Sequence, residues 1–109
     1  MKVLLVYAHP EPLSLNGSIK NFVVERLQAA GHTVQVADLY AMKWKPALDA
    51  ADSLDGAATE RFDAALDSRR AFDSGRQSAD ITLEQQKLLW ADTVILQFPM
   101  WWFSMPAIL

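Results

Sequence analysis

The apolar run that follows the first two residues constrains the fold more than any other feature of this sequence. Residues 3–8 read "VLLVYA", with β-branched and aromatic side chains and without the apolar–polar alternation of a strand exposed on one face. A continuous apolar run is typical of a strand covered on both faces, as in the middle of a parallel sheet. The sequence therefore predicts a central strand over residues 3–8.

The next segments show first a helical and then an extended pattern. Over residues 15–30 the apolar side chains recur at steps of three and four, which predicts an amphipathic helix. Ser14 or Asn16 is available as its N-cap, and Gly31 as its C-terminal stop. Residues 33–39 alternate, as expected for the second strand of a strand–helix–strand unit.

The second half of the chain predicts a crossover, a helix and a strand. Acidic residues, arginines, serines and glycines crowd residues 49–80, which indicates a solvated crossover with one short helix. Ser78 is placed to cap a helix over residues 79–91, and Asp80 in its first turn suits the helix dipole. Residues 93–98, "TVILQF", predict a third buried strand.

This order of elements predicts an α/β fold, the first half of a doubly wound parallel sheet, with residues 1–109 in a single domain. In such folds ligands bind beyond the carboxyl ends of the strands, where the strand order reverses. The loops after the first and third strands are then expected to be neighbours at one edge of the sheet.

Composition excludes several classes of function. Ten basic and thirteen acidic residues give a net charge of -3, which disfavours a nucleic-acid partner. The chain has no cysteine and only two histidines, so we expect no zinc site or other metal centre. The longest apolar segment, residues 93–109, is interrupted by polar residues and prolines and is shorter than the roughly 20 residues of a membrane helix, so we expect no membrane span.

The first candidate binding loop is "AHPEPLSLNGS", residues 8–18. It lacks the G-x-G-x-x-G pattern, which disfavours a bare nicotinamide Rossmann domain. Ser14, Asn16 and Ser18 lie where free backbone amides at a helix N-terminus can bind a phosphate or pyrophosphate. Alternatively, Ser14 and Asn16 only cap the helix, and His9 is a strand-end residue bonded to backbone.

The second candidate loop is "FPMWWFSMP", residues 98–106. Pro99 cannot donate to a sheet, so the chain is expected to turn there across the top of the sheet. Trp101, Trp102 and Phe103 could form a wall for a flat conjugated ligand, or be core or subunit-contact residues. An aromatic wall beside a phosphate-binding helix start favours a flat heterocycle that carries phosphate, as a flavin nucleotide does.

Three blocks of the sequence, "LLVYAHPEPLSLNGSIK", "DLYAMKWKP" and "ADTVILQFPMWWFSMPAIL", resemble the flavodoxin-like NAD(P)H:quinone oxidoreductases. The resemblance implies a cytoplasmic homodimeric enzyme that uses FAD, or alternatively FMN, to transfer a hydride from NAD(P)H and two electrons to a quinone. It implies that the flavin phosphates are held by His9, Ser14, Leu15, Asn16 and Ser18. It implies that the isoalloxazine ring is lined by Pro99, Met100, Trp101, Trp102 and Phe103, with Trp102 and Phe103 also facing the substrate.

The sequence also departs from that family. Leu13 and Leu15 stand where relatives often carry Thr and Phe, and the Gly-rich flavin loop and the catalytic Tyr and His expected further along are not in these residues. We therefore expect an N-terminal part of the domain that is inactive and aggregation-prone by itself. Two other classes stay open: a flavin-binding ancillary subunit of a potassium-efflux system, and a one-electron flavodoxin carrier, which the lack of a Ser/Thr-x-Thr-Gly signature disfavours.

Overall fold

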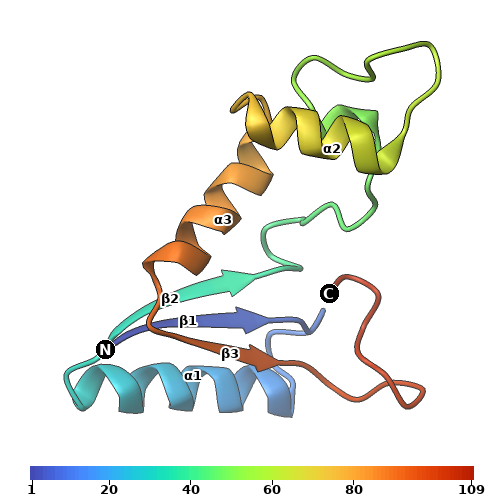
Figure 1. The fold of residues 1–109 in the computed structure, drawn as a ribbon. Helices are drawn as coiled ribbons and strands as arrows, with labels where there is room; N and C mark the ends of the chain where they lie inside the picture. The colour runs from blue at the N-terminus through green and yellow to red at the C-terminus, as the bar shows by residue number, and fades with distance from the viewer. The chain divides into compact units, whose positions relative to one another are not determined.

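A computed structural model describes all residues from Met1 to Leu109 and divides the chain into two compact units. The first unit combines Met1–Pro46 with Lys87–Leu109, and the second is Ala47–Gln86 (Figure 1). No helix in the structure has both the length and the apolar character needed to cross a membrane.

The first unit is built on a parallel sheet of three strands, β1 (Lys2–Tyr7), β2 (Thr33–Asp38) and β3 (Thr93–Gln97). Their order is β2-β1-β3, so β1 lies in the middle and pairs with both neighbours. Tyr7, the last residue of β1, lies opposite Asp38 of β2 and Gln97 of β3. The three strands therefore end together, and the loops after β1 and β3 begin side by side, as predicted.

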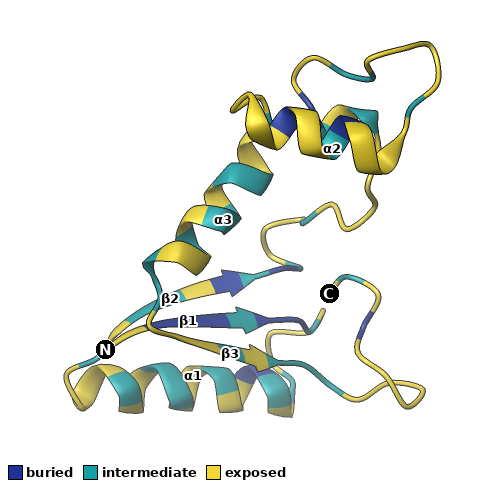
Figure 2. Ribbon diagram, in the orientation of Figure 1, coloured by how far each residue is buried: buried dark blue, intermediate teal, exposed yellow.

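The core of this unit is β1 itself (Figure 2). The side chains of Val3, Leu4, Leu5 and Tyr7 are almost completely buried, and Leu5 has no exposed surface. Burying a large apolar side chain contributes about 1.5–3 kcal/mol, so this one strand supplies much of the stability of the sheet. The prediction of a central strand covered on both faces is confirmed.

The prediction that the third strand is buried is wrong for this structure. β3 pairs with β1 alone, so its other edge has no strand partner. Leu96 is 57% exposed and Val94 is 42% exposed. The apolar sequence of β3 indicated the strand correctly, but burial of its side chains also needs a neighbouring strand and elements that cover both faces of the sheet.

Helix α1 (Leu15–Ala29) follows β1 and packs along one face of the sheet (Figure 1). Ser14 is its N-cap, with Oγ accepting a hydrogen bond from the amide of Gly17 at 3.1 Å. At the other end Gly31 has a φ of 87°, the left-handed conformation that glycine adopts at little cost. Of the apolar positions, Val23 and Leu27 are half-buried, whereas Phe22 is exposed.

The second unit contains the 3-10 helix η1 (Ala50–Asp52), α2 (Ala64–Asp73) and most of α3 (Ala79–Trp90). The one short helix expected in the crossover is α2, and η1 was not predicted. Ser78 precedes α3 and its carbonyl accepts from the amide of Thr82, but its hydroxyl is buried without a partner. The prediction that the Ser78 side chain caps this helix is therefore wrong.

Candidate functional site

The loops after β1 and β3 meet beyond the carboxyl ends of the strands. The rings of His9 and Trp101 lie edge to face, with centroids 5.8 Å apart. The side-chain amide of Gln97 donates a 2.7 Å hydrogen bond to the carbonyl of Asn16, 81 positions earlier in the chain. The amide of Ala8 also donates to the carbonyl of Gln97 at 3.0 Å. The two candidate loops therefore form one continuous surface of the first unit.

Side chains inside the first loop hold its backbone. Nδ1 of His9 accepts from the amide of Glu11 at 3.0 Å, and the carboxylate of Glu11 accepts from the amide of Leu13 at 2.8 Å. Because Nδ1 is an acceptor here, the neutral ring carries its proton on Nε2. The interpretation that His9 is bonded to backbone is confirmed, and its Nε2 donor has no partner within the chain.

The start of α1 supplies further donors. The amides of Leu15 and Asn16, the first two of the helix, have no acceptor within the chain, as expected for a helix N-terminus. The Ser14 hydroxyl caps the helix by accepting from Gly17, and its own hydrogen stays available to donate. Capping and phosphate binding are therefore compatible at Ser14.

Gly17 was not among the predicted site residues. It is the one buried residue of α1, and a Cβ at this position would overlap the carbonyl oxygen of Pro12. Only glycine lets the loop fold this closely over the first turn of the helix. The signal was present in the sequence, because Gly17 is the single glycine of this loop.

The second loop presents its aromatic residues from a strained turn. The amide of Trp101 donates to the carbonyl of Ser104 at 2.9 Å, and the amide of Ser104 donates back at 3.0 Å. Between them, Trp102 and Phe103 have φ values of 52° and 63°, the left-handed conformation that bulky residues rarely adopt. Their side chains are 95% and 98% exposed, and their own amides have no acceptor within the chain.

The exposed aromatic side chains of Trp102 and Phe103 and their strained backbone are both unfavourable for a folded protein. Two bulky residues in a left-handed turn cost on the order of 1–3 kcal/mol each, and large aromatic side chains gain nothing from facing water. Strain of this kind is concentrated at ligand-binding sites. Trp102 and Phe103 are therefore not part of the core that residues 1–109 form in this structure.

All ten predicted site residues lie in these two loops or in the first turn of α1. Seven of them carry a free donor, an aromatic ring or a hydrogen bond already described: His9, Ser14, Leu15, Asn16, Trp101, Trp102 and Phe103. The other three are Pro99, which is half-buried, and Ser18 and Met100, which are exposed; their side chains make no contact described above. Sequence reasoning missed Gln97 and Glu11, whose roles depend on hydrogen bonds that only the folded loops reveal.

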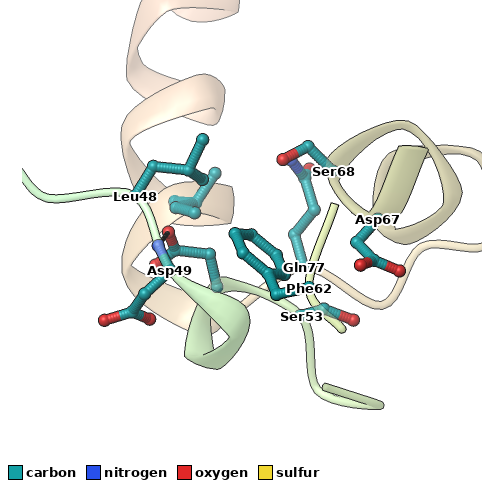
Figure 3. Close-up of a pocket in the computed structure, with 9 residues that line it drawn as sticks. Leu48, Asp49, Ser53, Phe62, Asp67, Ser68 and Gln77 are labelled. Atoms are coloured by element: carbon teal, nitrogen blue, oxygen red, sulfur yellow. Dashed lines mark hydrogen bonds between the residues drawn. The ribbon is translucent and has the colours of Figure 1, made fainter. Parts of the chain in front are cut away.

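A separate cavity of about 150 Å³ lies within the second unit, between Leu48 and Ile81 in sequence (Figure 3). None of the predicted site residues lines it. The Asp67 carboxylate at its wall is 2% exposed and accepts from the amides of Asp63 at 2.9 Å and Ala58 at 2.8 Å. These two hydrogen bonds, with the charge of Arg70 nearby, hold the pKa of Asp67 below its usual value. Its bonds are already satisfied inside the unit, which makes Asp67 a structural residue.

A second ion pair of this unit joins Asp55 and Arg76, whose charged groups are 3.1 Å apart. Hydrogen bonding to the Arg76 guanidinium lowers the pKa of Asp55, and the carboxylate in turn raises the pKa of Arg76. Both side chains are about half exposed, so the pair adds little to stability.

Comparison with known proteins identifies the family. The chain matches a family model described as the flavodoxin-like fold over residues 1–109. It therefore belongs to that family, as the strand order and the quoted motifs led us to expect.

Named relatives share nearly all of these residues. The chain is 50% identical over 109 residues to a ribosyldihydronicotinamide dehydrogenase-like protein, traD, from Penicillium crustosum, covering 100% of this chain and 41% of the relative. It is 47% identical to human ribosyldihydronicotinamide dehydrogenase [quinone], covering 99% of this chain and 47% of the relative. A crystal structure of a protein assigned as a quinone reductase, from Klebsiella pneumoniae, superposes with a TM-score of 0.96 at 66% identity, covering 99% of this chain and 42% of that one. The chain thus spans less than half the length of these relatives.

Proposed function

We propose that these residues form the N-terminal part of a flavin-dependent NAD(P)H:quinone oxidoreductase with a single flavodoxin-like domain. The observation that carries the proposal is the meeting of the two loops, fixed by the His9–Trp101 ring contact and the Gln97–Asn16 hydrogen bond. One loop offers free donors for phosphate and the other offers aromatic rings for a flat heterocycle. A flavin nucleotide combines both chemical features.

The first loop suits the phosphate end of the flavin. The free amides of Leu15 and Asn16, Nε2 of His9 and the Ser14 hydroxyl are donors, as a phosphate requires. The partial positive charge of the α1 N-terminus adds to them, and α1 has no acidic residue in its first turn to oppose an anion. Asn16 and Ser18 would complete this end of the site with their polar side chains.

The second loop suits the ring. Pro99, Met100, Trp101, Trp102 and Phe103 would line the isoalloxazine, and the free amides of Trp102 and Phe103 would donate to its polar edge. Trp102 and Phe103 would also contact the quinone. Their left-handed backbone fixes the direction of these amides before any ligand binds, so little ordering is needed on binding.

A bound flavin supplies two-electron chemistry: a hydride and a proton taken from NAD(P)H and the solvent reduce a quinone to a hydroquinone and leave NAD(P)+. The residues of this chain bind and orient the reactants. The dehydrogenase names of the relatives favour this enzyme over a transporter-regulating subunit. They also add ribosyldihydronicotinamide to the electron donors that should be tested.

We expect FAD rather than FMN, a homodimer in the complete protein and a cytoplasmic location, from the resemblance to the family. The test is to express the complete domain, meaning these residues together with the rest of the polypeptide. Its flavin content, its solution mass and its quinone turnover with NADH, NADPH and ribosyldihydronicotinamide should then be measured. A flavin-loaded protein that reduces quinone supports the proposal. A protein that neither retains flavin nor turns over with any donor contradicts it.

A further inference from the structure

Gln97 occupies a position that the proposed function does not use. It is the last residue of β3, and its backbone belongs to the sheet: it lies opposite Tyr7, and its carbonyl accepts from Ala8. Its side chain leaves the sheet and donates to the carbonyl of Asn16 at 2.7 Å. One half-buried residue therefore joins the end of β3, the end of β1 and the first turn of α1.

The chemistry of this bond fixes its direction. A carbonyl oxygen can only accept, so the nitrogen of the Gln97 amide must face Asn16. At 2.7 Å the bond is at the short end of the usual range for an amide donor and a carbonyl acceptor. Loss of the donor removes a direct hydrogen bond between the first turn of α1 and the end of β3, and so permits a small shift of the one relative to the other.

That shift would act on the two halves of the candidate site. Asn16 carries one of the two free amides at the start of α1, whereas Pro99 begins the ring-binding loop only two positions after Gln97. The hydrogen bond of the Gln97 side chain thus links the helix start that carries these amides directly to the strand that leads into the aromatic turn. The His9–Trp101 contact, a ring edge against a ring, adds a second but less directional link.

We propose that Gln97 is a positioning residue that sets the spacing between the phosphate-binding amides of α1 and the aromatic turn. The site then selects a ligand whose phosphate lies at a fixed distance from its flat ring, without any contact between Gln97 and the ligand. This inference rests on the proposed function. It goes beyond that function because Gln97, which does not contact the ligand, is proposed to decide how strongly the site prefers a ligand with a phosphate.

The test compares flavins with and without phosphate in the complete domain. Gln97→Met keeps the length of the side chain and removes the donor without adding charge. We expect the affinity for FAD and FMN to fall about tenfold, as loss of one hydrogen bond in a half-buried site implies, and the affinity for riboflavin to change less than twofold. Gln35→Met, the same change at a half-buried position in β2, is the matched control and should leave all affinities unchanged.

The outcomes separate the two proposals. If the wild-type protein binds no flavin, both proposals fail. If it binds flavins and prefers those with phosphate, but Gln97→Met weakens all of them equally or none of them, the proposed function stands and the positioning role is wrong. If Gln97→Met does not fold, Gln97→Asn decides the matter, because it keeps an amide that is one methylene too short to reach Asn16. An unchanged preference for phosphate in Gln97→Asn overturns the inference.

Discussion

The two units of this chain are stabilised in different ways. The sheet unit depends on apolar burial along β1, where Val3, Leu4 and Leu5 are almost inaccessible to solvent. The crossover unit, Ala47–Gln86, depends on polar bonds: Asp63 caps α2, Asp49 and Asp52 form a capping box around η1, and Asp67 accepts two amides. Its buried residues include Asp67 and Ser53 beside Ala71, rather than large apolar side chains.

The difference between apolar burial in the sheet unit and polar bonds in the crossover unit explains why the strained turn at Trp102 and Phe103 lies in the sheet unit. A left-handed turn of two aromatic residues needs a rigid support, and the turn follows β3, which is paired to the buried strand β1. The crossover unit has no comparable turn of bulky residues. We therefore expect substitutions in the two units to affect different properties, and the following predictions test that division.

The largest effect is expected in the core of the sheet. Leu5→Ala removes a completely buried side chain of β1 and should lower the free energy of unfolding by about 2–5 kcal/mol. Leu66→Ala in α2 is the control in the other unit. Because Leu66 is mostly exposed, this substitution should change the free energy of unfolding by less than about 0.5 kcal/mol. Denaturant unfolding of the complete domain measures both. Equal losses would mean that the crossover unit also relies on apolar burial.

The next effect concerns the phosphate end. Asn16→Ala in the complete domain should weaken flavin binding by roughly 1–3 kcal/mol, the usual cost of leaving a charged or buried partner unmatched. The titration should be repeated with Asn21→Ala, an exposed position of the same helix, which should bind flavin as the wild type does. Unchanged affinity in Asn16→Ala would restrict the role of this residue to its backbone amide.

A third effect has opposite signs for stability and activity. Trp102→Gly should relieve the left-handed backbone and leave the free energy of unfolding unchanged or higher by about 1 kcal/mol. Quinone turnover should nevertheless fall, because the ring is proposed to shape the substrate pocket. Thermal unfolding measures the stability of Trp102→Gly, and steady-state kinetics of the same preparation measure its quinone turnover. Loss of folding with normal turnover per folded molecule would support a structural role for this ring instead.

The last effect concerns the dependence of stability on pH. The pKa of Asp67 is lowered in the folded state, so its stabilising effect is complete above the usual value of 3.8 and is lost as the pH falls through the folded value. Asp67→Asn should therefore narrow the difference in stability between neutral and acidic pH. Asp73→Asn, at the exposed end of α2, is the control. An equal pH dependence in the wild type and Asp67→Asn would show that Asp67 does not couple folding to protons.

Local sequence patterns predicted most of the helices and strands. They failed where burial or hydrogen bonding depends on residues far away in the sequence. The run at residues 3–8 and the helical steps at residues 15–30 were sufficient to predict β1 and α1. Burial of β3 was predicted wrongly because its apolar sequence cannot show whether a neighbouring strand is present. The Ser78 cap was also predicted wrongly, since the backbone carbonyl serves the helix there and the hydroxyl is buried.

The sequence predicted which two loops form the candidate site, but not the backbone conformation of the loops or the contacts between them. Residue types at positions 14–18 and 99–103 indicated a phosphate end and an aromatic end. The left-handed turn could not be predicted, because Trp102 and Phe103 both oppose that conformation. The Gln97–Asn16 bond could not be predicted either, because it joins residues 81 positions apart whose side chains give no sequence signal for pairing.

The central claim is that the two loops together bind one flavin nucleotide. The most direct measurement is a crystal structure of the complete domain grown with FAD or FMN. The account predicts the phosphate within hydrogen-bonding distance of the amides of Leu15 and Asn16, and the ring against the turn at Trp102 and Phe103. A flavin bound elsewhere, or one whose phosphate lies away from the start of α1, would contradict it.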